Sequence, residues 1–315
     1  MPNFAVIDLG SNSVRLCVYE VKDDHKQRYL KKDFKTLLNN KVMAGLSAYV
    51  ENGIFTELGI SHAVNVLNGH NKRLKYFNCK RCDIFATAVL RNANNSDDAI
   101  ARIEKETGFS ITILSEQSEA HLGFIGASSD QYLENGTLID IGGGSSELTR
   151  IKKGQDVDSA SIAMGSLSAY TKLVNAILPT KKEMNEIYRL FLRKIEKLES
   201  PERYETGKLY AIGGSIRAAA KVNAEILSLD KRPETLSLTD IDQLIKCGSN
   251  TPDAFAHFCL KACPERIHTL LPGCLIARAF MEKCRVDKLT ICKNGLREGY
   301  LIERMLLDKQ RKAKV

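Results

Sequence analysis

Short apolar segments that end in glycine recur along the chain and define its predicted architecture. Thr137 to Leu148 reads TLIDIGGGSSEL, an apolar run that carries one acid, Asp140, and then breaks into three glycines. Phe4 to Ser13, FAVIDLGSNS, repeats this arrangement around Asp8. Short β-branched runs that end in glycine are typical of buried strands followed by tight turns. The repetition predicts two similarly built halves, each with a turn after its first strand.

A third apolar run, Leu209 to Ile212, ends in Gly213 and Gly214 and opens directly into a predicted helix from Ile216 to Val222. Backbone N–H groups at the start of a helix favour a bound anion, so this turn is a third candidate anion site. Elsewhere, helical spacing alternates with short strand-like runs, which predicts an α/β protein. The predicted helices include 56–76, 99–107 and 170–198, and the strands include 82–89, 111–114 and 289–292.

Length and composition are those of a globular protein with two domains. The chain has 315 residues, of which 43% are hydrophobic and 27% are charged. Its apolar runs are far shorter than the ~18 residues of a membrane span, so we expect no membrane association. Nine cysteines, an odd number scattered through the chain, favour free thiols in a reducing compartment and predict a cytoplasmic protein. The net charge of +8 favours anionic partners.

Cys79 and Cys82 form a C-x-x-C pair. No second pair lies at a zinc-like spacing, and no histidine lies nearby, so metal binding or redox chemistry is not favoured.

The glycine turns and the acids beside them indicate phosphate chemistry. Three glycines allow several N–H groups to converge on one anion, and a carboxylate at the end of a strand is a typical ligand of hydrated Mg²⁺. A glycine-rich turn next to a buried, hydrogen-bonded Asp140 is the structural alternative. Neither a P-loop nor a G-x-G-x-x-G fingerprint occurs. Phosphoryl transfer needs mainly positioning and charge neutralisation, which this set of residues supplies.

Two further residues have a functional and a structural interpretation. Arg91 follows a predicted strand, where its planar guanidinium could reach a phosphate; a solvated surface arginine is the alternative. Glu119 lies in the first turn of a predicted helix, where an acid stabilises the helix dipole. Its competing role is to accept the proton of an attacking water.

Seven motifs occur in order along the chain. They are DLGSNSVRL (8–16), ATAVLRNANN (86–95), ILSEQSEA (113–120), IDIGGGSSEL (139–148), AIGGSIRAAA (211–220), LLPG (270–273) and NGLREG (294–299). From residue 4 to about residue 302, the chain thereby resembles the exopolyphosphatase/guanosine pentaphosphate phosphohydrolase (Ppx/GppA) family in its short form. The resemblance implies an α/β fold of the actin-like superfamily, with two ribonuclease H-like domains that contain mixed five-stranded sheets around an interdomain cleft. We expect domain I to comprise 1–120 plus 300–315, and domain II to comprise 121–299.

The resemblance also implies the roles of individual residues. Glu119 would orient and deprotonate the attacking water, and Asp140, Glu147 and Asp8 would hold Mg²⁺. The cofactor is expected to be Mg²⁺, with a monovalent cation such as K⁺ as a further candidate. The residues expected to bind phosphate are Gly10, Ser11, Asn12, Ser13, Arg91, Gly142, Gly143, Gly144, Ser145, Ser146, Gly213, Gly214 and Ser215.

The implied activity is Mg²⁺-dependent release of the terminal phosphate from inorganic polyphosphate. Guanosine penta/tetraphosphate is the alternative substrate, and a weakly catalytic alarmone or polyphosphate sensor is the alternative function. One departure favours a sensor, because Ser168 stands where the family's Gly-x-Val-Arg-Leu stretch has its arginine. A nuclease that uses the four carboxylates is a third reading, which the glycine turns argue against, so no nucleic-acid partner is expected. The family also implies a homodimer.

Overall fold

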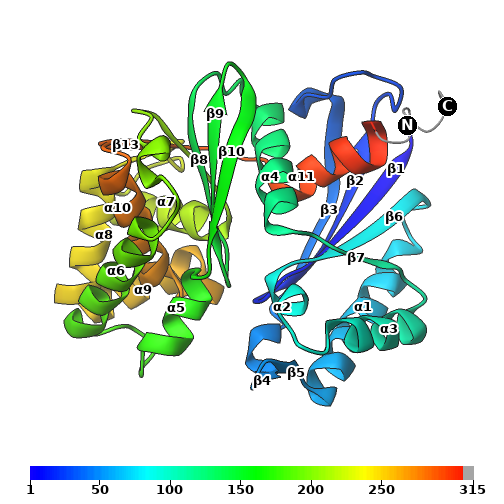
Figure 1. Cartoon of the computed structure of the whole chain (residues 1–315), viewed down its shortest axis with the longest axis horizontal. Coiled ribbons are helices and arrows are strands. Elements are labelled where there is room, and N and C mark those ends of the chain that lie inside the picture. Colours follow the sequence, from blue (N-terminus) through cyan, green and yellow to red (C-terminus); the bar gives the residue numbers. More distant parts are fainter. Residues whose placement is uncertain (308–315) are drawn as a thin grey trace. The chain divides into compact units, whose positions relative to one another are not determined.

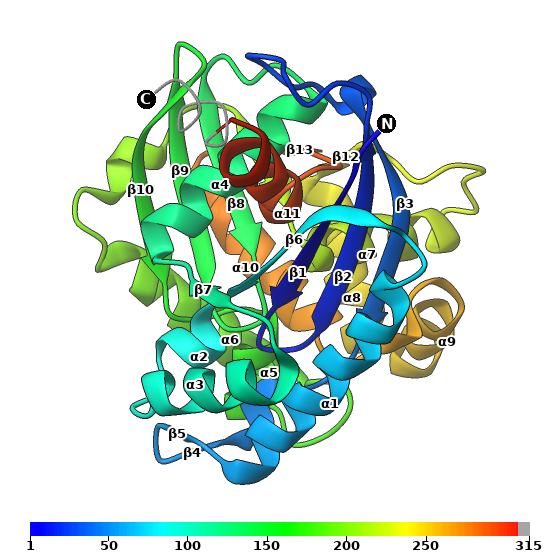
Figure 2. The same cartoon turned by 90° about the vertical axis from the view of Figure 1, so that its right-hand side faces the viewer.

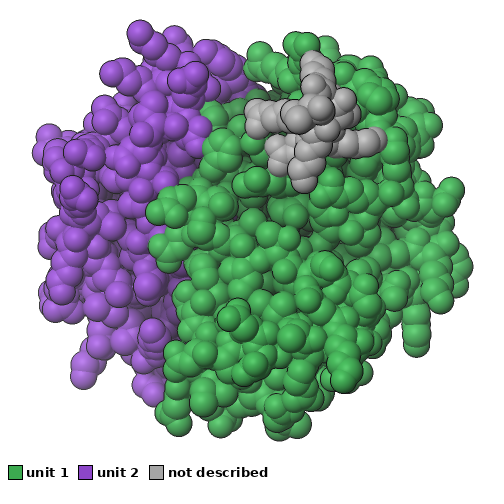
Figure 3. All heavy atoms as spheres, turned by 45° about the vertical axis from the view of Figure 1, so that its right-hand side comes forward, with its two compact units in different colours: residues 1–130, 294–315 green, residues 131–293 purple. Residues whose placement is uncertain are grey.

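The computed structural model describes residues 1–307 and contains two compact α/β units. Unit 1 consists of residues 1–130 and 294–315, and unit 2 of residues 131–293 (Figure 3). The predicted domain limits at residues 120 and 299 fall inside helices α4 (Glu116–Asp130) and α11 (Leu296–Tyr300), both of which belong whole to unit 1. The predicted range of domain I beyond residue 307 lies outside the described residues.

Unit 1 is built on a mixed five-stranded sheet with the order β3-β2-β1-β6-β7 (Figure 1). The central strand β1 pairs antiparallel with β2 and parallel with β6. Its strands are β1 (Asn3–Leu9), β2 (Val14–Val21), β3 (Phe34–Val42), β6 (Cys79–Ala86) and β7 (Ile111–Ile113), and a separate two-stranded sheet contains β4 (Val50–Glu51) and β5 (Ile54–Phe55). Its helices are α1 (Glu57–Leu74), α2 (Ala88–Arg91), α3 (Ser96–Thr107), α4, α11 and the π-helix η5 (Leu301–Leu307).

Strand β1 is buried on both faces, which explains its nearly continuous apolar sequence. Ala5, Ile7 and Leu9 pack with residues of α1 and α3 in one hydrophobic cluster. Phe4 and Val6 belong to another cluster, which contains residues of α4, α11 and η5. Because side chains alternate along a strand, Asp8 takes the same face as Phe4 and Val6 and is directed to the side of α11.

Helices α4 and α11 pack so closely that their backbones touch, and Figures 1 and 2 both show them side by side. A Cβ atom placed on Gly126 would overlap the carbonyl oxygen of Gly295, and one placed on Gly299 would overlap the carbonyl oxygen of Leu122. Glycine at these positions therefore permits the C-terminal helix to cover the sheet of unit 1.

The C-x-x-C pair lies on β6, and none of the nine cysteines, all of which lie within residues 1–307, forms a disulfide. A register irregularity opposite Asn3 and Phe4 lets Cys79 and Cys82 pack against the same hydrophobic cluster. At about 3.3 Å per residue, three residues of a strand span about 10 Å, whereas a disulfide needs Cα atoms within about 7 Å. The strand thus provides no support for a disulfide here.

Unit 2 is built on a mixed sheet with the order β10-β9-β8-β11-β13-β12. The predicted mixed sheet is confirmed, but it has six strands instead of five, because the short β12 pairs antiparallel with β13. Its strands are β8 (Gly136–Ile141), β9 (Ser146–Lys152), β10 (Gln155–Ile162), β11 (Leu209–Ile212), β12 (Thr235–Ser237) and β13 (Lys288–Ile291). Its helices are α5 (Ser166–Leu173), α6 (Lys181–Glu196), α7 (Gly214–Ile226), α8 (Leu238–Asn250), α9 (Pro252–Ala262) and α10 (Leu270–Lys283).

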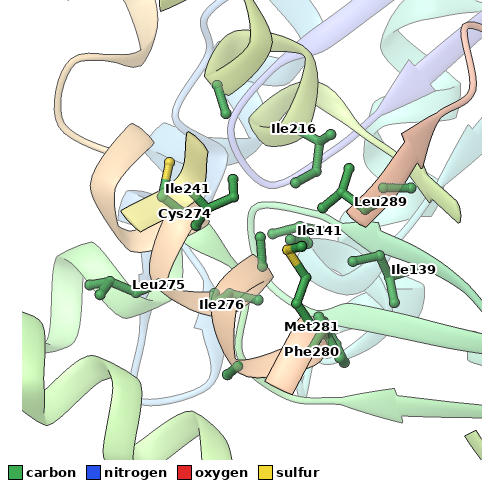
Figure 4. Packing of buried hydrophobic residues seen from close by; sticks show 14 of the residues in the cluster. Ile139, Ile141, Ile216, Ile241, Cys274, Leu275, Ile276, Phe280, Met281 and Leu289 are labelled. Carbon is green, nitrogen blue, oxygen red and sulfur yellow. The ribbon is translucent and has the colours of Figure 1, made fainter. Parts of the chain in front are cut away.

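Helix α10 lies at the centre of the hydrophobic core of unit 2. Almost every residue from Leu270 to Met281 is buried, and α5, α6, α7 and α8 all contact this helix. A helix that is apolar on all sides has to be covered on all sides. Figure 4 shows Ile276 and Met281 of α10 beside Ile139 and Ile141 of β8. Within residues 1–307, no helix is both long and apolar enough to cross a membrane.

The contact between α4 and α11 predicts a large effect of one added methyl group. Gly299→Ala should lower the free energy of unfolding by about 3 kcal/mol or more, because a Cβ there overlaps the backbone of Leu122. Urea denaturation measures the change. Gly69→Ala in α1 is the matched control: its Cβ would meet only the flexible end of Arg73, and alanine has the higher helix propensity. Equal stabilities of the two variants would contradict the close crossing.

Candidate functional site

The two segments that repeat in the sequence form the same kind of turn, one in each unit. Gly10 to Ser13 joins β1 to β2, and Gly142 to Ser145 joins β8 to β9. In the first turn, the Gly10 N–H donates to the Ser13 carbonyl at 3.2 Å, and in the second the Gly142 N–H donates to the Ser145 carbonyl at 3.0 Å. The repeated sequence pattern therefore corresponds to a repeated four-residue hairpin turn.

Residues at the start of helix α5 donate hydrogen bonds to the glycine carbonyl groups of the Gly142–Ser145 turn. The Ser166 N–H donates to the Gly142 carbonyl at 2.9 Å, and the N–H groups of Leu167 and Ser168 donate to the Gly143 carbonyl at 3.0 and 2.9 Å. The Ser168 hydroxyl donates to the Gly144 carbonyl at 3.1 Å. Within residues 1–307, no acceptor pairs with the N–H groups of Gly143 and Gly144. Those donors are thus available to an anion.

Gly165 permits this close approach between α5 and the turn. A Cβ atom on Gly165 would lie 2.6 Å from the carbonyl oxygen of Gly142 and 2.7 Å from that of Gly143. Real Cβ atoms do not come so near to backbone oxygen, so a larger residue would push α5 away from the turn.

The third glycine turn, between β11 and α7, lies beside Asp140. Gly213 has a φ of 99°, which is strained for residues other than glycine, and a Cβ there would lie 2.5 Å from Oδ1 of Asp140. Strands β8 and β11 are parallel neighbours, with Asp140 paired to Ile212. Their carboxyl ends, where ligands bind in open α/β sheets, therefore lie together.

Arg266, which the sequence analysis did not select, lies against the start of α7. A Cβ atom on Gly214 would overlap Nη2 of Arg266 and would lie 2.9 Å from its Cζ. Burial lowers the pKa of the Arg266 guanidinium. No ion pair joins it to a carboxylate within residues 1–307. A cation at the positive end of a helix dipole is unfavourable, and a bound anion would remove that cost.

The acids predicted to hold Mg²⁺ in unit 2 are neighbours on two strands. Asp140 pairs with Glu147 across β8 and β9, so their side chains share one face of the sheet. Glu147 is buried and accepts a hydrogen bond from the Ser161 hydroxyl at 3.2 Å. In residues 1–307, no group of three or more His, Cys, Asp or Glu side chains could hold a metal ion by itself. Two carboxylates fit Mg²⁺, which keeps phosphate and water as its other ligands.

In unit 1, Arg91 and Glu119 form an ion pair. Arg91 ends the short helix α2 after β6, and Glu119 lies in the first turn of α4 after β7. Nη1 of Arg91 donates to Oε1 of Glu119 and, at 2.8 Å, to the Leu114 carbonyl. Nη2 is buried without a hydrogen-bond partner within residues 1–307 and lies 3.6 Å from Oε1 of Glu116. The pair fixes the orientation of Glu119 and leaves one nitrogen of the guanidinium unsatisfied.

Asp8 also pairs with an arginine. Nη1 of Arg297 in α11 donates to Oδ2 of Asp8 at 2.8 Å, whereas Oδ1 of Asp8 is turned toward Gly10. Burial alone would lower the pKa of Arg297, but Glu298 and Asp8, among other neighbours, outweigh it and raise this pKa well above the ordinary value. Glu298 is itself fixed by the Tyr19 hydroxyl at 2.7 Å. Asp8 is therefore first of all an ion-pair partner, with one oxygen directed to the turn.

The side chains of the remaining predicted residues differ in whether they already form hydrogen bonds within the protein. The Ser146 hydroxyl donates to the Met164 carbonyl at 2.8 Å, and the Ser215 hydroxyl donates to Ser166 at 3.0 Å, so both are used internally. Nδ2 of Asn12 is buried and has no hydrogen-bond partner within residues 1–307. Ser11 and Ser145 are buried, and Ser13 is half-buried. Unit 1 thus contains Asp8, Gly10, Ser11, Asn12, Ser13, Arg91 and Glu119, and unit 2 contains Asp140, Gly142, Gly143, Gly144, Ser145, Ser146, Glu147, Gly213, Gly214 and Ser215.

Known proteins are similar to this chain in sequence and in fold. Exopolyphosphatase 1 of Mycobacterium leprae is 24% identical over 307 residues, which cover 95% of this chain and 88% of that protein. The crystal structure of an exopolyphosphatase from Cytophaga hutchinsonii has a TM-score of 0.82 at 20% identity, and that of the Ppx/GppA family member of Aquifex aeolicus has 0.77 at 22%. Each alignment covers 98% of both chains. The model of the Ppx/GppA phosphatase family matches residues 18–308, and the chain therefore belongs to that family.

Proposed function

We propose that the protein is an exopolyphosphatase that releases the terminal phosphate of inorganic polyphosphate. The observation that carries the proposal is the Gly142–Ser145 turn, whose Gly143 and Gly144 N–H groups have no acceptor within residues 1–307 and which begins two residues after Asp140. Two of the similar proteins described above are named exopolyphosphatases. A turn with converging amide donors suits the charged oxygens of a phosphoryl group.

The reaction is a hydrolysis at the terminal phosphorus. The oxygen of a water molecule attacks phosphorus, the bridging P–O bond to the next phosphoryl group breaks, and Glu119 takes the proton of the water. The ion pair with Arg91 orients Glu119. The glycine-turn N–H groups stabilise the charge on the transferred phosphoryl oxygens, an effect of about 3 kcal/mol for one well-placed donor.

Asp140 and Glu147 would hold Mg²⁺, because they are cross-strand neighbours with oxygen ligands. When bound, this ion neutralises charge on the phosphoryl oxygens. In unit 1, Asp8 has only its Oδ1 left for a ligand, since Oδ2 binds Arg297. A role for K⁺, a homodimer and a cytoplasmic location remain predictions.

Phosphate release from two substrates tests the proposal. The purified chain is incubated with Mg²⁺ and either long-chain polyphosphate or guanosine pentaphosphate, and kcat/KM is measured for each. We expect a higher value for polyphosphate. A value for the nucleotide that equals or exceeds it would reverse the order and identify a guanosine pentaphosphate phosphohydrolase. Binding without turnover would instead identify a sensor, and cleavage of RNA or DNA that Asp140→Asn abolishes would identify a nuclease.

Glu119→Gln should lower kcat by about 10²- to 10⁴-fold and leave KM nearly unchanged, because glutamine keeps the shape but cannot accept the proton. Steady-state phosphate release with polyphosphate gives both constants. Glu57→Gln is the matched control, since Glu57 also lies in the first turn of a helix, α1, and its side chain is 75% exposed. Near-normal kcat in Glu119→Gln would refute the assignment of Glu119 as the base.

Arg266→Gln should raise KM for polyphosphate about tenfold, because the substitution removes a cation at the start of α7. In the absence of ligand, the free energy of unfolding should be unchanged or higher, because the substitution removes a buried cation beside a helix N-terminus. Kinetics and urea denaturation are measured on the same preparations. Arg285→Gln, at a side chain that is 82% exposed, is the control. An unchanged KM together with a marked loss of stability would assign Arg266 a structural role only.

A further inference from the structure

Two buried serines of unit 2 connect the third glycine turn to the Gly142–Ser145 turn. The Ser215 hydroxyl, in the first turn of α7, donates to the Ser166 hydroxyl at 3.0 Å. The Ser166 hydroxyl, at the start of α5, donates to the Gly142 carbonyl at 3.1 Å. Ser166 is 0% exposed and Ser215 is 1% exposed.

The Gly142 carbonyl, which ends this series of hydrogen bonds, determines which hydroxyl donates to which. A carbonyl oxygen can only accept, so the proton of Ser166 goes to Gly142, and Ser166 then accepts the proton of Ser215. A buried hydroxyl without a hydrogen-bond partner costs its full desolvation free energy. The two hydroxyls and the Gly142 carbonyl are therefore expected to stay hydrogen-bonded to one another. A Cβ placed on Gly273 in α10 would lie 2.9 Å from Cβ of Ser215, so the backbone of α10 closes the space behind the serines.

We infer that Ser166 and Ser215 are positioning residues that hold the Gly142–Ser145 turn and the start of α7 in one fixed arrangement for binding phosphate. This inference rests on the proposed function and deepens it. The Gly143 and Gly144 N–H groups have no acceptor within residues 1–307, whereas the Gly142 carbonyl and the first turn of α7 are linked through the two hydroxyls. The Ser168 hydroxyl adds a further link, because it donates to the Gly144 carbonyl at 3.1 Å and accepts from the Gly165 N–H at 2.9 Å.

The substitutions Ser166→Ala and Ser215→Ala, singly and together, test the inference. Ser129→Ala is a matched control in unit 1: its buried hydroxyl also donates to a backbone carbonyl, that of Gly126 at 2.6 Å, and accepts from a side chain, Asn294 at 3.0 Å. The first measurement is hydrogen–deuterium exchange of the peptide that spans residues 142–146. The second is the affinity for inorganic phosphate with Mg²⁺ by isothermal titration calorimetry, and the third is KM and kcat with polyphosphate.

Ser215→Ala should increase exchange at residues 142–146, although Ser215 is remote from them in sequence, and should weaken phosphate binding and raise KM about five- to tenfold. The phosphate affinity and KM of the double variant should match those of Ser166→Ala within about twofold, because both hydroxyls belong to one series of hydrogen bonds. Ser129→Ala should change neither exchange at 142–146 nor KM. Unchanged exchange in Ser215→Ala, or affinity and KM like those of Ser129→Ala, would overturn the inference.

The two proposals can fail separately. If the wild type releases no phosphate from polyphosphate, the proposed function fails, and the exchange comparison still decides whether the serines position the turn. If the wild type is active and the serine variants match Ser129→Ala, only the positioning role is refuted.

Discussion

The contact of α5 with the Gly142–Ser145 turn is the constraint on which the arrangement of unit 2 depends. Every glycine carbonyl of that turn accepts a hydrogen bond from Ser166, Leu167 or Ser168. Because a peptide group is planar, fixing its carbonyl also fixes the direction of the N–H on the following residue. The N–H groups of Gly143 and Gly144 are thus held in fixed directions, so a ligand that they bind would not have to order a flexible loop.

Much of this arrangement could be predicted from local sequence. An apolar strand with an acid and a glycine run is a short-range signal, and it located the turns after Asp8, Asp140 and Ile212. The family resemblance indicated the α/β fold, which the structure and its relatives confirm. The three-residue strand β12 escaped prediction, because Thr235–Ser237 is too short to show a period.

Contacts between distant parts of the chain could not be predicted in this way. Arg297 and Asp8 are 289 positions apart, and nothing in either segment indicates that they pair. The same holds for Arg266 and Gly214, whose contact depends on how the segment before α10 packs against α7. The sequence also could not show that Ser146 and Ser215 use their hydroxyls internally, because a serine in a glycine turn suits both roles.

The close crossing of α4 and α11 has a consequence for how the protein is synthesised. Phe4 and Val6 share a hydrophobic cluster with Tyr300, Leu301 and Met305, so one wall of unit 1 comes from the last part of the chain. Unit 2, in contrast, is one continuous stretch, residues 131–293. All residues of unit 2 are therefore synthesised before the segment that completes unit 1. The nascent sheet of unit 1 has to stay incompletely covered on one face until α11 and η5 (residues 296–307) have been translated.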